Sequence, residues 1–407
     1  MIDDPPVLDR PVDTGRRMKL KFPSIDHLNA ALSTELTVPL AVHHAGRNAV
    51  SFDLADGNEL ASIQIEALER EYGATAVEDY RYDLEDTDLF DPLNFGPDTA
   101  EAPSLDDVLE EIGARSAWAQ SRGRNVIIAI VDTGIDGTRP EFPAWKRVSQ
   151  SWAPIGDDPW QDWQGHGTMC ACIATATRAE GGQFDGVAPD ARLMSCKTRF
   201  YDLELAAIYD ELTTLARAGN VVIASNSFGS KTGTPPPEPA DSDFLPALDD
   251  AIEAGVMPFF SAGNYHDIAG GDPHAHEPNS IWLHKGRHDV FTVGACDERM
   301  AMWYYSSRGL GQFYPSPGTS AKPDAVGMTP ANGRILFGSD VRTMPVGWGT
   351  SGCCPQAAGL AALIMSRSAP LDRPTLSRQE LFAHICSTAK SLGHHPASQG
   401  AGLIQCP

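Results

Sequence analysis

The sequence has few basic residues and no long apolar run. Of its 407 residues, 31 are Lys or Arg and 54 are Asp or Glu, so the net charge is −23. Nucleic acids and anionic membrane surfaces bind basic faces, so this balance argues against both as main partners. No stretch reaches the roughly 18 apolar residues that a membrane-spanning helix needs. We therefore expect neither nucleic-acid nor membrane partners.

Cysteine is absent from the first 169 residues. The eight cysteines are Cys170, Cys172, Cys196, Cys296, Cys353, Cys354, Cys386 and Cys406. Neither close pair, at 170/172 or 353/354, has the CxxC spacing of a structural zinc site. The first residues, MIDDPPVLDRPVDT, hold acids and prolines where a secretion signal has a basic start and an apolar stretch. We therefore expect thiols in a reducing cytoplasm, and no disulfide framework.

Residues 17–83 are predicted to form a small α+β domain. Apolar residues alternate at Met18, Leu20 and Phe22, as they do in a strand. A helical pattern begins after Ser24, which is a suitable N-cap. Extended and helical patterns then continue in the order strand, strand, helix, strand. This βαββαβ order is typical of a ferredoxin-like unit.

Acidic segments flank this domain. Residues 1–16 are expected to form a disordered N-terminal arm. Residues 84–107 contain eight acids, three prolines and no Lys or Arg. Such a segment buries little surface, so we expect an exposed linker that a protease can cut.

From residue 108 to residue 407, apolar strands alternate with helical patterns. The run 126–131 is continuously apolar, as a central parallel strand requires. Further strands are expected near 192–196, 221–225, 256–261 and 290–295, and helices near 166–177, 203–218, 245–254 and 351–367. The pattern predicts an α/β fold, a doubly wound and mainly parallel sheet with helices on both faces. Functional residues then belong at the carboxyl ends of the strands.

Four polar residues lie where this fold would place a site. Asp132 directly follows the first strand, and His166 opens a helix in Gly-His-Gly-Thr. Ser351 begins a long helix, whose N–H groups would favour an oxyanion, and Pro355 is expected in its first turn. Asn264 ends Ser-Ala-Gly-Asn and can supply a second donor. Taken singly, Asp132 could be a helix cap or a metal ligand, Ser351 could be a simple N-cap, and His166 alone is weak evidence.

Together the motifs are far more specific. The order Asp132, His166, Asn264, Ser351 resembles that of the subtilisin-like serine peptidases. Further matches in family order are Gly186–Ala191, Asn226–Gly229, Thr292–Ala295, Ser306–Gly309 and Gly400–Ile404. The resemblance covers about 108–407. It implies a subtilisin-like catalytic domain that hydrolyses peptide bonds in proteins or peptides.

The resemblance also implies roles. Ser351 would be the nucleophile, His166 its general base and acid, and Asp132 the group that orients His166. Asn264 and the Ser351 N–H would stabilise the oxyanion. The implied substrate-binding residues are Ser227, Phe228, Gly229, Ser261, Ala262 and Gly263. For Phe228, core packing remains an alternative.

No cofactor is required by such a mechanism, and we assign no metal ligand. Calcium remains open, because Glu141 falls where members of the family often have an acidic calcium ligand. The stretch 265–289 departs from the family and contains five histidines. Within it, His274 and His276 could bind a metal with Asp267 and Asp272, although a solvated polar loop near the cleft is the preferred interpretation.

The resemblance bears on regulation too. In the family, a βαββαβ unit before the catalytic domain often assists folding and then blocks the cleft. Residues 17–83 are similar to such a propeptide, with a permanent recognition domain or a docking module for another protein as the alternatives. The sequence thus predicts a cytoplasmic serine endopeptidase regulated by its N-terminal domain. Two alternatives stay open: a processing protease dedicated to one partner, and a pseudoprotease scaffold.

Overall fold

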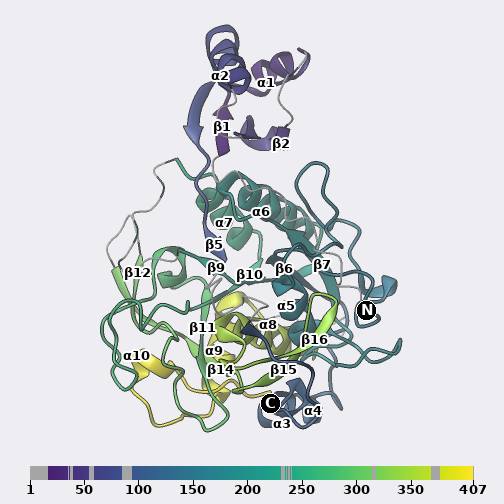
Figure 1. The fold of residues 1–407 in the computed structure, drawn as a ribbon, viewed down its shortest axis with the longest axis vertical. Helices are drawn as coiled ribbons and strands as arrows, with labels where there is room; N and C mark the ends of the chain where they lie inside the picture. The colour runs from purple at the N-terminus through teal and green to yellow at the C-terminus, as the bar shows by residue number, and fades with distance from the viewer. Residues whose placement is uncertain are drawn as a thin grey trace, which may run out of the picture.

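The computed structural model describes residues 17–406 except 35, 37–39, 55–58, 85–93, 231–233, 235, 237–238, 240, 314–317 and 368–375. The predicted arm 1–16 therefore lies outside the described residues. Within the described part of the chain, no helix is long and apolar enough to cross a membrane. Figure 1 shows a small N-terminal domain standing on a larger domain.

The N-terminal domain has the predicted element order. Its elements are β1 (Arg17–Lys21), α1 (Ile25–Leu32), β2 (Leu40–His44), the 3-10 helix η1 (Ala45–Arg47), β3 (Ala49–Asp53), α2 (Glu59–Tyr72) and β4 (Thr75–Glu78). The strands pair antiparallel in the order β2-β3-β1-β4. Leu20 and Phe52 pack with Leu28 of α1 and Leu68 of α2, so the helices cover one face of the sheet. In Figure 1 the opposite face is turned toward α6 and α7 of the larger domain.

The larger domain is built on a parallel sheet, which confirms the predicted fold class. The sheet strands are β6 (Val126–Asp132), β7 (Arg192–Lys197), β8 (Val221–Asn226), β10 (Met257–Ser261), β11 (Phe291–Cys296) and β14 (Ala325–Met328). They run in the order β14-β11-β10-β8-β6-β7, and every neighbouring pair is parallel. From β6 the chain passes to β7 on one side and later to β8 on the other. The crevice at such a reversal is where α/β sheets place their sites.

Central strand β6 explains the two layers of helices. All seven of its residues are buried. Ile128 and Ile130 belong to a core shared with α5 (His166–Thr175) and α8 (Gly349–Arg367). Ile127 and Val131 belong to a second core with α6 (Asp202–Arg217) and α7 (Phe244–Glu253). Because alternate residues face opposite sides of a strand, a continuous apolar run is needed to fill both cores.

The remaining elements surround this sheet. They are β5 (Asp83–Leu84), α3 (Leu105–Glu111), α4 (Ala114–Ala117), η3 (Ala144–Lys146), β9 (Phe228–Gly229), η4 (Leu283–Gly286), β12 (Gly309–Phe313), β13 (Gly318–Lys322), β15 (Gly333–Phe337), β16 (Asp340–Met344), α9 (Arg378–Thr388) and α10 (Pro396–Gln399). The β12–β13 and β15–β16 hairpins had no counterpart in the sequence prediction.

Part of the predicted acidic linker is held against the larger domain. Gly96 exchanges backbone hydrogen bonds with Thr343, and Asp98 pairs with Arg334 at 2.5 Å. Residues 94–107 thus have fixed partners, whereas 85–93 lie outside the described residues. The domain boundaries themselves stay a prediction.

Candidate active site

The predicted acid and histidine meet at the carboxyl end of β6. Asp132 is its last residue, and His166 is the first residue of α5. His166 Nδ1 lies 2.8 Å from Asp132 Oδ1 and 3.0 Å from Oδ2, and both side chains are buried. Gly167 permits this approach, because a Cβ there would overlap the carbonyl oxygen of Gly134. The pair has the geometry in which a carboxylate fixes the imidazole orientation.

A second carboxylate, which the sequence analysis did not identify, sets the start of α5. Asp162 accepts hydrogen bonds from the N–H groups of Gln164, Gly165 and Thr168. Its oxygens also accept the hydroxyls of Thr133, at 2.7 Å, and Thr168, at 2.6 Å. Asp162 therefore joins the strand end at Asp132 to the helix that carries His166. The signal in the sequence was an aspartate shortly before a helix whose N-cap is a glycine, Gly165.

Ser351 lies inside α8, and here one sequence expectation was wrong. The helix begins at Gly349, so Pro355 lies within it, beyond the first turn. Since proline has no N–H, it cannot bond to the Ser351 carbonyl four residues earlier. That carbonyl instead accepts the Ser227 hydroxyl at 3.4 Å and the Cys170 thiol at 3.5 Å. The proline thus frees a contact that ties the serine to α5 and the end of β8.

Cys170 connects the residues of the candidate triad. Its Sγ lies 3.7 Å from His166 Nδ1 as well as 3.5 Å from Ser351 O. His166 and Ser351 are therefore brought to the same place, although 185 residues separate them. Burial, with Asp132 nearby, raises the pKa of the Cys170 thiol well above its ordinary value. The thiol is accordingly a neutral packing group beside the site.

Asn264 presents an oriented donor. Its Oδ1 accepts both the N–H and the hydroxyl of Thr350, each at 3.0 Å. Its Nδ2 is buried and makes no hydrogen bond among the described residues. Buried amide N–H groups are normally satisfied, so one left open beside Ser351 suits a charge that develops only during reaction.

The predicted substrate-binding residues lie at the ends of two neighbouring strands. Ser227, Phe228 and Gly229 follow β8, and Ser261, Ala262 and Gly263 stand at the end of β10. Phe228 and Gly229 form β9, which pairs antiparallel with Leu84 and Asp83. Ser227 contacts the Ser351 carbonyl and Gly263 contacts Thr350, so both segments lie next to the start of α8.

Backbone groups on the second edge are partly used within the protein. The Ala262 N–H bonds to Val293 O, and both backbone groups of Gly263 bond to Thr350 and Ser307. The Phe228 ring is fully buried among Tyr82, Phe244 and other aromatic rings. The Phe228 ring therefore packs in the core, as the alternative had it, and a role of its backbone in substrate binding stays a prediction.

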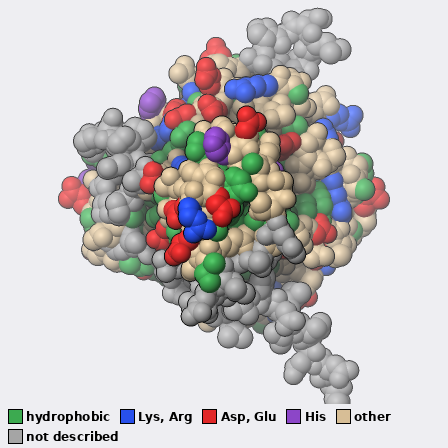
Figure 2. All heavy atoms as spheres, turned by 90° about the horizontal axis from the view of Figure 1, so that it is seen from above, with side chains coloured by type: hydrophobic (Ala, Val, Ile, Leu, Met, Phe, Trp, Pro, Cys, Tyr) green, Lys and Arg blue, Asp and Glu red, His purple; other side chains and the backbone are tan. Residues whose placement is uncertain are grey.

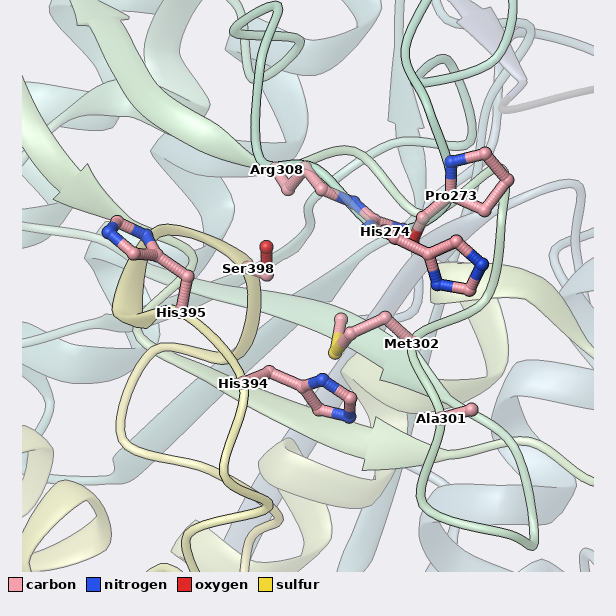
Figure 3. A pocket seen from close by; sticks show the side chains of 8 residues that line it. All are labelled: Pro273, His274, Ala301, Met302, Arg308, His394, His395 and Ser398. Carbon is pink, nitrogen blue, oxygen red and sulfur yellow. Dashed lines mark hydrogen bonds between the residues drawn. The ribbon is translucent and has the colours of Figure 1, made fainter.

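The histidines of 265–289 do not gather as metal ligands. His274 lines a pocket of about 130 Å³ with His394, His395 and Arg308 (Figure 3). The His276 ring stacks on that of His395 at 4.0 Å. Among the described residues, the only trio of potential ligands close enough for one ion is Asp132, His166 and Cys170.

The surroundings of Glu141 do not fit a calcium ion. Its Oε1 accepts the Gln183 N–H at 2.7 Å, and the Arg139 guanidinium lies 3.4 Å from Oε2. A guanidinium therefore lies against the carboxylate oxygen that a calcium ion would need.

Comparison with known proteins defines the class. The model of the subtilase family matches residues 123–402. The chain belongs to the subtilase family and is a subtilisin-like serine protease.

Individual relatives resemble it moderately. An intracellular serine protease of Paenibacillus polymyxa is 28% identical over 306 residues, 73% of this chain and 83% of that protein. Subtilisin E of Bacillus subtilis (strain 168) is 27% identical over 285 residues, 69% of this chain and 65% of that one. A calcium-dependent protease of Trichormus variabilis is 29% identical over 319 residues, 70% and 45% of the two chains. The chain thus spans less than two thirds of the last two relatives.

Proposed function

We propose that the protein is a cytoplasmic serine endopeptidase that works through Asp132, His166 and Ser351. The observation that carries this proposal is the buried, open amide of Asn264 next to Ser351 and the Asp132–His166 pair. An aspartate, a histidine and a serine with an adjacent unused donor together suit acyl transfer. The intracellular relative and the free cysteines support the cytoplasm as its compartment.

In this mechanism His166 removes the Ser351 proton as Oγ attacks the peptide carbonyl. Asp132 stabilises the imidazolium, and Asn264 Nδ2 with the Ser351 N–H binds the oxyanion. His166 then gives the proton to the leaving amine, and an acyl-enzyme forms on Ser351. Water, activated by His166, releases the acid and restores the serine.

The test removes the nucleophile alone. A Ser351→Ala variant should keep the wild-type thermal transition, lose peptide hydrolysis and lose labelling by a fluorophosphonate. A pseudoprotease scaffold predicts instead that the wild type resists labelling. Retained cleavage by purified Ser351→Ala protein would refute the assignment.

We further propose that the N-terminal domain inhibits the catalytic domain. Its β1 places Arg17 and Lys19 against acids at the start of α6, and the following segment pairs with β9. An added strand on β9 takes a backbone edge that a peptide substrate would need.

Processing distinguishes an inhibitor that is removed from a permanent domain. If the linker is cut, wild-type protein loses roughly its first 85–105 residues, whereas Ser351→Ala protein stays full length. Wild type that remains intact and active would favour the permanent recognition domain. Profiling of cleaved peptides separates general proteolysis from the alternative, a protease dedicated to one partner.

A further inference from the structure

Three segments that are far apart in the sequence meet around a small pocket (Figure 3). Its volume is about 130 Å³, and its polar lining residues are His274, Arg308, His394, His395 and Ser398. Sites for drug-sized molecules measure about 300–1,000 Å³, so this pocket suits a small ion. None of the described residues that line it is acidic, and Arg, His and Ser side chains can all donate hydrogen bonds. The lining therefore favours an anion over a cation.

Arg308 brings a buried positive charge to the pocket. The residue is 1% exposed, and within the described part of the chain its guanidinium donates only to backbone carbonyls, those of Pro273, Ala275, Trp303 and Ser306. Asp272 acts on it electrostatically, but no described carboxylate forms an ion pair with it, and burial lowers the pKa of Arg308 to about 10. Buried charges in proteins are normally paired with an opposite charge. An anion in the pocket would supply that partner.

Donors remain for such a ligand. A guanidinium has five N–H groups, and Arg308 makes four hydrogen bonds to described residues. Ser398 is 5% exposed, and its hydroxyl makes no hydrogen bond to a described residue. In Figure 3 this hydroxyl is turned toward Arg308, and the rings of His274 and His394 lie around the same space. The His394 ring is held there, because its Nε2 donates to the Met300 carbonyl at 2.8 Å.

We propose that this pocket binds a small oxyanion, inorganic phosphate or sulfate, between the Arg308 guanidinium and the Ser398 hydroxyl. Arginine suits such a ligand, because its planar N–H groups match the oxygens of a tetrahedral anion. The inference goes beyond the proposed peptidase function and does not depend on it.

The pocket is connected to the candidate active site through Ser307, which directly precedes Arg308. The Ser307 N–H donates to the Gly263 carbonyl at 2.8 Å, and the Ser307 hydroxyl accepts the Tyr265 N–H at 3.1 Å. Gly263 and Tyr265 are the residues on either side of Asn264. An oxyanion bound to Arg308 therefore stabilises the segment that holds Asn264 in place.

The test is calorimetric titration of inorganic phosphate into full-length Ser351→Ala protein at constant ionic strength. This background lacks the proposed nucleophile, so the chain stays intact during the measurement. We expect one phosphate site per chain, competition by sulfate but not by chloride, and a thermal transition that rises with phosphate concentration.

Three variants in the same background locate the site. Ser398→Ala should weaken phosphate binding about 10- to 100-fold, the range expected for a hydrogen bond to a charged group, and Arg308→Met should abolish it. Arg299→Met is the matched control, because the Arg299 side chain is 85% exposed and does not line the pocket. Loss of this charge should change the affinity less than about fivefold.

Each outcome decides the proposal. A titration without a saturable site, unchanged affinity in Ser398→Ala, or an equal loss in Arg299→Met would overturn it, and the last two would mean an adventitious ion only. If Arg308→Met does not fold, the comparison of Ser398→Ala with Arg299→Met still decides. Since binding is measured on the Ser351→Ala protein, none of these results bears on the peptidase proposal.

Discussion

Removal of one buried charge at the interface between the two domains tests the proposal that the N-terminal domain is an inhibitor. Arg17 Nη1 lies 2.5 Å from Glu204 Oε1, and both side chains are fully buried. The Arg17 guanidinium also lies 3.9 Å from the centre of the Tyr201 ring. Glu204 and Tyr201 belong to the start of α6, so Arg17→Met removes a contact between the domains and leaves Glu204 buried without its cation.

The expected cost follows from that burial. Removing one partner of a buried ion pair costs about 3–5 kcal/mol, whereas an exposed pair contributes about 0–1 kcal/mol. Arg17 also pairs with Asp53 inside its own domain, so part of the loss does not affect docking. Docking of the N-terminal domain should still weaken by about 100-fold or more, since 1.4 kcal/mol corresponds to a factor of ten.

Lys21→Met is the matched control. Lys21 lies on the same strand and pairs with Asp243 at 3.1 Å, but its side chain is 31% exposed. Loss of this charge should change docking less than about fivefold.

The assay is peptide hydrolysis by the full-length variants, together with limited proteolysis of the linker. Arg17→Met should be more active than wild type and its linker cut faster, whereas Lys21→Met should behave as wild type. If Arg17→Met folds normally and its activity equals that of Lys21→Met, the interface does not control access to the site.

Three further predictions concern pH, the oxyanion and the thiol. Burial at the interface raises the pKa of Asp79 from 3.8 to about 7. Between about pH 4 and pH 7 the docked protein therefore binds one more proton at Asp79 than the undocked protein. The contribution of Asp79 to docking should thus be fully present below about pH 4 and be lost as pH rises through about 7. Asp79→Asn should flatten that profile when linker proteolysis is followed against pH. Asn264→Ala should lower kcat by about 100- to 1,000-fold with little change in KM. A rise in KM as large as the fall in kcat would contradict an oxyanion role. A small mercurial should inactivate the enzyme through Cys170 while iodoacetate reacts slowly with the buried, protonated thiol, and Cys170→Ala should resist both.

Local patterns predicted most of the fold. The continuous apolar run 126–131 indicated a strand that is buried on both faces. Ser24 indicated the start of a helix because it is a suitable N-cap, and its Oγ indeed accepts the His27 N–H. The positions of Asp132, His166 and Ser351 followed from motifs at strand and helix ends. Local sequence did not show that these three residues lie close together, because that depends on the order of the strands in the sheet.

Features that depend on distant partners were missed. Arg17 and Lys19 alternate with the apolar residues of β1, and both are buried against acids more than 180 residues away. No spacing along the chain reveals such a partner. Similarly, the consequence of Pro355 for the Ser351 carbonyl required the true start of α8 and the position of Ser227.

The distribution of acidic and basic side chains differs between the surface of the N-terminal domain and its interface with the larger domain. Figure 2 looks onto the N-terminal domain and shows acidic side chains interspersed with Lys and Arg, without a broad basic surface among the described residues of that face. The basic side chains of β1 instead pair with acids at the starts of α6 and α7, and so contribute to docking of the N-terminal domain.

Docking of the N-terminal domain and its pairing with β9 are parts of one continuous contact. Beyond β4, the Asp79 carboxylate accepts the Leu203 N–H, and the Tyr80 carbonyl accepts the Asp202 N–H. The Tyr82 N–H then donates to Phe200 O, and β5 reaches β9. A strand of two residues is too short to hold that edge alone, because isolated short strand pairs are marginal in water. The ion pairs at the start of α6 therefore determine how firmly the segment 80–84 stays on β9, and release of the domain and opening of the edge should occur together.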